Sequence, residues 1–93
     1  MDVENEKLFN MASELIRIKK MLFIQCREDV NHIIDNKVTS ENYIESTFDR
    51  LLDLYDDEDC TELFWTLIEY VETFNEGIST FYRRQIEVLS RET

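Results

Sequence analysis

The fold of this 93-residue chain depends most on residues 63–71, which read Leu63-Phe64-Trp65-Thr66-Leu67-Ile68-Glu69-Tyr70-Val71. These nine positions place apolar side chains around much of the circumference of a helix, and such a helix is buried on more than one side. The apolar residues that follow continue at steps of three and four, which is the helical period. We therefore expect one long helix over residues 59–90. A break near residues 75–77, at the only glycine of the chain, is the alternative.

Two helices are predicted before this one. Over residues 3–36 apolar side chains again recur at steps of three and four, which predicts a first long helix, with a break near residues 25–29 as the alternative. A short helix over residues 41–55 follows. Thr39 or Ser40 is expected to cap it, because a hydroxyl there accepts a hydrogen bond from a backbone N–H of the first turn.

Four consecutive acids, residues 56–59, separate the second helix from the third. Like charges in a row favour a solvated turn over a helix. Asp59 and Glu62 have the spacing of a capping box, in which each side chain accepts from a backbone N–H near the start of the helix. We therefore expect the third helix to begin at Asp59.

Together these elements predict an all-α fold. The chain has no proline and one glycine, so it has few connections, and its hydrophobic content of 43% is enough for a packed core. We predict a single domain, an antiparallel bundle of three helices, two long and one short. The short helix covers only half of each long one, and residues 63–71 need burial on two sides. A homodimer would supply the missing cover.

The net charge of −11 is carried by one segment. Residues 41–76 hold twelve acidic side chains and a single base, Arg50, while the rest of the chain is balanced. This sign disfavours direct binding to nucleic acid, whose phosphates attract bases. A basic protein partner is electrostatically favourable. An acidic segment of this kind also suits an inhibitor that mimics nucleic acid on a basic protein.

Several classes of protein are not indicated by the sequence. The acidic N-terminus does not resemble a signal peptide, and no apolar run is long enough to span a membrane, so we expect a cytoplasmic protein. Cys26 and Cys60 have no metal-site spacing and are expected to be buried apolar side chains. No metal and no cofactor are predicted.

One motif resembles that of a known enzyme family. Arg27 and the only histidine, His32, have the Arg-x4-His spacing of HEPN-type ribonucleases, which are small all-α dimers. The resemblance implies that Arg27 stabilises a phosphate and that His32 acts as a general acid or base. In this chain the motif lies on the first helix, whereas the family carries it later. We expect His32 to be an ordinary polar residue and keep the ribonuclease as an alternative.

Two acidic pairs resemble a second family. Asp53 with Asp56, and Glu69 with Glu72, have the spacing of the paired acids of all-α nucleotide pyrophosphohydrolases. In that family such acids hold Mg²⁺, which prefers several carboxylate oxygens. With so many acids in this segment the spacing also arises without a metal site, so this activity is a further alternative.

The sequence favours a non-enzymatic interaction protein, either a small regulator, an adaptor or a chaperone-like subunit, that binds a protein partner. Aromatic side chains and exposed acids are the side chains expected to contact it. The candidate partner-binding residues are Trp65, Tyr70, Asp49, Asp53, Asp56, Asp57, Glu58 and Asp59.

Overall fold

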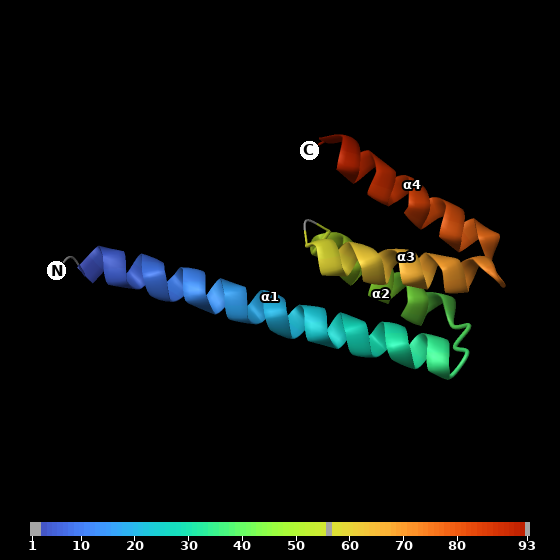
Figure 1. Cartoon of the computed structure of the whole chain (residues 1–93), viewed down its shortest axis with the longest axis horizontal. Helices are drawn as coiled ribbons and strands as arrows, with labels where there is room; N and C mark the ends of the chain where they lie inside the picture. The colour runs from blue at the N-terminus through green and yellow to red at the C-terminus, as the bar shows by residue number, and fades with distance from the viewer. Residues whose placement is uncertain (1–2, 56, 93) are drawn as a thin grey trace.

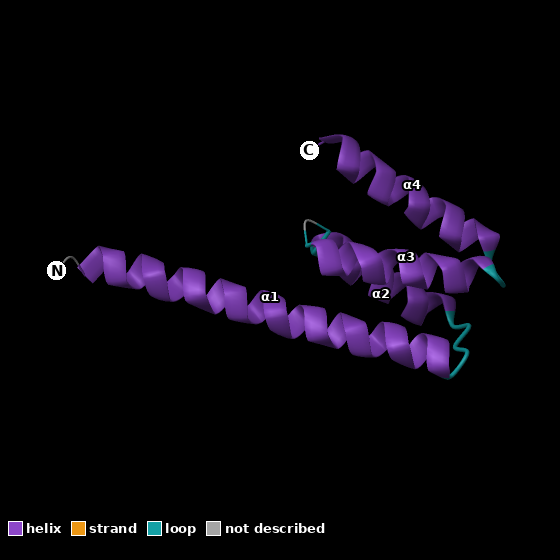
Figure 2. Cartoon of the chain, viewed as in Figure 1, coloured by secondary structure: helices purple, strands orange, loops and turns teal. Residues whose placement is uncertain are grey.

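The computed structural model describes residues 3–55 and 57–92, and the side chains of residues 10–55 and 57–91. These residues form four helices and the turns that connect them, with no strand (Figures 1 and 2). The helices are α1 (Val3–Asp35), α2 (Glu41–Asp53), α3 (Glu58–Glu72) and α4 (Glu76–Glu92). The all-α class is confirmed, whereas the predicted count of three helices is wrong.

Helix α1 is one uninterrupted helix of 33 residues, so the alternative break near residues 25–29 does not occur. At 1.5 Å per residue it is about 50 Å long. It ends at Asp35 because Lys37 adopts a left-handed backbone with φ of 52°. The backbone N–H of Val38 then donates to the carbonyl of Ile33 at 2.9 Å, and that of Lys37 to Ile34 at 3.3 Å, which is a Schellman ending.

Helix α2 begins as predicted. Ser40 is its N-cap, and the Ser40 hydroxyl accepts from the backbone N–H of Tyr43. The helix ends at Asp53, two residues before the predicted end, because Leu54 and Tyr55 form a turn whose N–H groups donate back to Leu51 and Leu52.

The start of α3 differs from the predicted capping box. Asp57, not Asp59, is the N-cap, and its carboxylate accepts from the backbone N–H of Asp59 at 2.9 Å. Asp56 lies outside the described residues. Of the other acids expected to form a turn, Glu58 and Asp59 lie instead in the first turn of a helix, where the positive end of the helix dipole stabilises them. This explains why α3 begins at Glu58, one residue earlier than expected.

The predicted helix over residues 59–90 is divided at Thr73–Asn75. The side-chain oxygen of Asn75 accepts from the backbone N–H of Ile78 at 3.2 Å and so starts α4. The Thr73 hydroxyl donates to the carbonyl of Tyr70 at 2.6 Å and helps to end α3. Local side-chain bonds to the backbone compete here with helix continuation. The alternative of a break near residues 75–77 is therefore correct in its approximate place, although the observed break begins two residues earlier, at Thr73.

Asn75→Ala tests the importance of this cap. We expect the variant to lose about 1 kcal/mol of unfolding free energy, because the Ile78 N–H loses its acceptor. Urea unfolding followed by circular dichroism measures this loss. Asn75→Ser is the matched control, since serine also caps helices and should retain most of the stability. An unchanged midpoint for Asn75→Ala would mean that the cap does not stabilise α4.

The core lies on α3, which contacts each of the other helices. Phe48 of α2, Phe64 of α3 and Tyr82 of α4 form its aromatic centre. The centre of the Phe48 ring lies 4.4 Å from the centre of the Tyr82 ring, in a stacked arrangement. It lies 5.1 Å from the centre of the Phe64 ring, in an edge-to-face arrangement. The second side of residues 63–71 is thus covered by α4 of the same chain. The break at Asn75 allows this, and the two-sided burial does not require a partner.

Both cysteines are buried, as predicted. Cys26 of α1 and Cys60 of α3 belong to the same core as the aromatic centre. Burial raises the pKa of the Cys26 thiol, which keeps it in its neutral form.

Helix α1 extends well past the other three (Figure 1). Its second half packs against α2 and α3 through Cys26, Val30 and Ile33, all fully buried. Side chains 10–22 are exposed, and we call this part of α1 the arm. Residues 23–55 and 57–92 are called the body.

Candidate functional site

The arm exposes a row of large apolar side chains. Met11, Leu15, Ile18 and Leu22 follow one another at steps of four, three and four, so they lie along one side of the helix. The row continues at the same spacing into the buried residue Cys26. Six apolar side chains of the arm are between 44% and 63% exposed: Met11, Leu15, Ile16, Ile18, Met21 and Leu22. Large exposed apolar patches are uncommon on soluble proteins and are typical of interaction sites.

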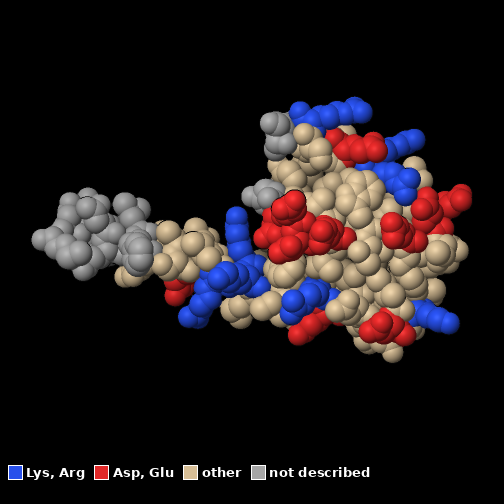
Figure 3. Space-filling model, viewed as in Figure 1, with Lys and Arg blue, Asp and Glu red and all other residues tan. Residues whose placement is uncertain are grey.

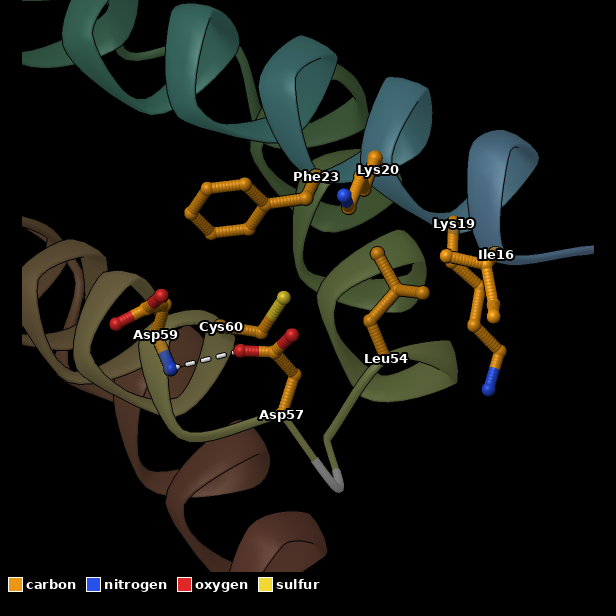
Figure 4. A pocket seen from close by; sticks show the side chains of 8 residues that line it. All are labelled: Ile16, Lys19, Lys20, Phe23, Leu54, Asp57, Asp59 and Cys60. Carbon is orange, nitrogen blue, oxygen red and sulfur yellow. Dashed lines mark hydrogen bonds between the residues drawn. The ribbon is translucent and has the colours of Figure 1, made fainter. Parts of the chain in front are cut away.

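A groove lies where the arm meets the body (Figure 4). Its volume is about 410 Å³. Lys19 and Lys20 stand on the α1 side, and Asp57 and Asp59 stand on the opposite side at the start of α3. The apolar part of its lining consists of Ile16, Phe23, Leu54 and Cys60. Leu54 and Cys60 belong to the core of the body, whereas none of the four residues of the row lines the groove.

The arm and the body differ in charge. Between residues 10 and 27 there are four bases and only one acid, Glu14. Residues 41–76 carry the acidic excess, and those that the structure describes lie in the body. Figure 3 shows bases where the arm meets the body and at the top of the body, where α4 lies in Figure 1, with a cluster of acids between them.

The structure does not bring Arg27 and His32 together within one chain. Five residues along a helix correspond to a rotation of about 140°, so the two side chains leave α1 in different directions. The Arg27 guanidinium lies 5.8 Å from the centre of the Phe23 ring. The His32 ring lies within hydrogen-bond distance of the Asn36 side-chain amide, with Nδ1 and Nδ2 3.1 Å apart. Each therefore contacts neighbours on its own helix.

The acidic pairs are also divided between different tasks. Glu72 forms an ion pair with Arg83 at 3.3 Å, while Glu69 is exposed. Asp53 is exposed at the end of α2, and its partner Asp56 lies outside the described residues. Among residues 10–55 and 57–91, no three His, Cys, Asp or Glu side chains are close enough to share a metal ion.

The remaining acidic candidates have different surroundings. Asp49 accepts a hydrogen bond from the Tyr82 hydroxyl at 2.9 Å, and Asp57 caps α3, so both stabilise the fold. Glu58 and Asp59 are exposed in the first turn of α3. Asp59 contributes in addition to the groove. The acids thus do not act as one uniform surface.

The two aromatic candidates are only partly available. Trp65 is 37% exposed, and the Arg83 guanidinium lies 6.0 Å from the centre of its ring. Tyr70 is half-buried and donates its hydroxyl to the carbonyl of Val38 at 2.9 Å, which ties α3 to the loop before α2. Trp65 keeps an exposed face for a partner, whereas Tyr70 mainly holds the fold.

Sequence reasoning missed a polar cluster between α1 and α2. The Asp29 carboxylate, almost fully buried, accepts from the Tyr43 hydroxyl at 3.0 Å and the Gln25 amide at 3.2 Å. It also forms an ion pair with Arg50 at 2.8 Å. Burial and the hydrogen bond to Asp29 raise the pKa of Tyr43. The only available signal was Arg50 itself, the single base of residues 41–76.

Tyr82 gives the fold a dependence on alkaline pH. Burial, followed by the hydrogen bond to Asp49, raises the pKa of Tyr82 well above its ordinary value of about 10. A raised pKa in the folded state means that this stabilisation is complete below about pH 10 and is lost as the pH rises further. We expect the urea concentration at the unfolding midpoint to decrease as the pH rises above 10, and to decrease less steeply with pH in Tyr82→Phe. Equal slopes for the two proteins would contradict this assignment.

No described helix combines the length and the apolar character needed to cross a membrane. Comparison with family models, with curated proteins and with solved structures finds no match to this chain.

Proposed function

We propose that this chain is a non-enzymatic helical interaction protein that binds a protein partner through the apolar row of its arm. The observation that carries the proposal is the exposure of that row. The same side of α1 is fully buried at Cys26 and Ile33, but Leu15 and Leu22 have no helix of the body over them. A helix with its own apolar row is the partner that best fits such a strip.

The arm is well separated from the parts of the molecule that stabilise the fold. The aromatic centre and the Asp29 cluster both lie in the body, and the arm side chains contribute to neither. Exposed apolar side chains in this number reduce solubility without stabilising the fold. Binding a partner gives them a role.

Capture experiments with matched variants test the proposal. In Leu15→Gln/Leu22→Gln two members of the row become polar. In Ser13→Gln/Arg17→Gln the same number of changes falls on the opposite side of the arm. We expect the wild type and the second variant to capture the same partner protein, and the first variant to lose it. A tagged second copy of this chain is included among the proteins tested as partner. Equal capture by all three would refute the proposal.

Circular dichroism and urea unfolding control for loss of fold. Because Leu15 and Leu22 lie outside the buried core, the unfolding free energy of the first variant should be within about 0.5 kcal/mol of the wild-type value.

A basic partner for the acidic segment remains a further prediction. The acids that remain for such a partner are Asp53, Glu58 and Asp59, all exposed.

A further inference from the structure

We infer that the arm binds a short amphipathic helix of another protein, about three turns long, that begins with basic residues and continues the line of α2 along the row. This inference rests on the proposed function, since it names the chemistry and the direction of the helix that the row binds. It is carried by the position of α2 on α1, by the place where α2 ends and by the charges at that end.

Helix α2 lies on the same side of α1 as the row. Asp29 follows Leu22 by seven residues and Met11 by eighteen, and both spacings return to the same side of a helix. The Asp29 carboxylate contacts α2 twice, at 3.0 Å from the Tyr43 hydroxyl and at 2.8 Å from the Arg50 guanidinium. The row is therefore the continuation, past the body, of the strip of α1 that α2 covers.

Helix α2 ends beside the start of the row. It runs back along α1, because the two helices are in contact and only residues 36–40 join them. Asp29 is level with the middle of α2, and both helices rise by the same 1.5 Å per residue. Asp53, the last residue of α2, is therefore level with about residue 23 of α1. The groove agrees with this estimate, because Leu54 lines it together with Phe23 (Figure 4).

The row lies in a corner that admits a single helix. Its exposed fractions increase away from α2, from 44% at Leu22 and 48% at Ile18 to 60% at Leu15 and 63% at Met11. On this side of α1, α2 stands above the row by about one helix diameter, or 10 Å. A membrane or a flat protein surface would meet α2 before it reached the row. The row is about 16 Å long, which about three turns of one helix cover.

The end of α2 that faces this corner is negative. The last carbonyls of α2 form the negative end of its dipole. Asp53 is exposed there, and Glu58 and Asp59 begin α3 on the other side of the turn. Lys19 and Lys20 leave α1 about 70° and 170° away from the middle of the row. Neither lysine forms an ion pair among the described side chains, so the acids at this end are left without a basic partner.

These charges determine the direction of the bound helix. It has to stop where α2 begins to cover α1, so one of its ends faces the negative end of α2. The N-terminal end of a helix is positive, and lysine or arginine in the first turn adds to that charge. The bound helix therefore runs in the direction of α2, antiparallel to α1. A second copy of this chain does not offer such an end, because α2, α3 and α4 each carry an acid in the first turn.

Two synthetic peptides of identical composition test the direction. Each has about 14 residues, leucines at steps of three and four, and the same side-chain lactam bridge to keep it helical. The first carries lysines in its first turn and glutamates in its last, and the second has these two sets exchanged. Fluorescence anisotropy at low salt should show the first binding about three- to tenfold more tightly. Equal binding, tighter binding of the second peptide or no binding of either would overturn the inference.

Two sets of charge variants test the place of contact. Asp53→Asn/Glu58→Gln/Asp59→Asn should bind the two peptides equally. The matched control, Glu28→Gln/Glu69→Gln/Glu87→Gln, removes three exposed acids elsewhere and should keep the preference for the first peptide. A preference retained in the first set, or lost in both sets, would contradict the assignment. Circular dichroism checks that both variants remain helical.

The row variant separates this inference from the proposed function. Leu15→Gln/Leu22→Gln should bind the first peptide at least about tenfold more weakly than the wild type, and unchanged binding would place the peptide elsewhere. Light scattering of the wild type should give the single-chain mass of 11.3 kDa. Twice that mass, lost in the row variant, would show that a second copy occupies the row and would overturn the inference. If a protein is still captured through Leu15 and Leu22 while the peptides show no preference, the proposed function stands and the inference fails.

Discussion

Replacing Phe48 with alanine is expected to destabilise the chain by about 3–5 kcal/mol, the usual cost of removing a buried phenylalanine. Phe48 is fully buried and lies between the rings of Phe64 and Tyr82, so it joins α2 to both helices of the α3–α4 pair. The alanine would leave a cavity at the point where three helices meet. Small domains are stable by only about 5–15 kcal/mol, so this loss removes a large fraction of the total.

Urea unfolding of Phe48→Ala followed by circular dichroism measures the effect, with Phe81→Ala as the matched control. Phe81 is 55% exposed, so the same chemical change there should cost much less. If Phe48→Ala proves too unstable to purify, Phe48→Leu retains most of the volume and should show a smaller loss. Similar losses for Phe48→Ala and Phe81→Ala would mean that the aromatic centre is not the core.

Asp29→Ala is expected to cost about 1–3 kcal/mol, as for a partly buried polar group left without its partner. The Tyr43 hydroxyl and the Gln25 amide would lose their acceptor at the contact between α1 and α2. Arg50 would lose its ion pair, but its side chain is 39% exposed and water can replace part of that contact. The main loss therefore comes from the hydrogen bonds rather than from the charge.

Two further variants separate these contributions. Asp29→Asn retains an oxygen that accepts from Tyr43 and should recover part of the stability. Glu28→Ala removes a neighbouring carboxylate that is exposed, and should change the unfolding free energy by less than about 0.5 kcal/mol. Equal effects of Asp29→Ala and Glu28→Ala would show that the cluster contributes little.

Helix content could be predicted from spacing alone, but several helix boundaries could not, above all the break between α3 and α4. The stripe of apolar residues keeps its phase through residues 73–77, because α3 and α4 each present an apolar side to the core. Periodicity therefore does not distinguish two consecutive helices that fold back on each other from one long helix. The deciding features are the side-chain bonds of Thr73 and Asn75 to the backbone, and these are weak signals in a sequence. The same applies to Asp57, which caps α3 in place of Asp59.

The candidate site was predicted only in part. The sequence indicated more apolar surface than one chain can cover, both at residues 63–71 and along the half of each long helix that the short helix does not reach. The structure covers residues 63–71 with α4 and leaves the arm of the first helix exposed. Which part of a uniform apolar stripe is buried depends on where the other helices end, and beside the arm these limits are the end of α2 at Asp53 and the start of α3 at Glu58. Asp29 lies on α1, whereas Tyr43 and Arg50 lie on α2, so no local sequence pattern predicts their contact.

The length of the arm also has a consequence for its own folding. Most of the stability of a helix in a protein comes from packing, and an isolated helix of this length is marginal in water. In a lone chain the arm amides should therefore exchange with solvent deuterium much faster than those of the second half of α1. Pairing with a partner helix would slow this exchange, so the protection of the arm should rise when the partner is added. One continuous helix then contains two regions, one ordered by its own chain and the other ordered by association.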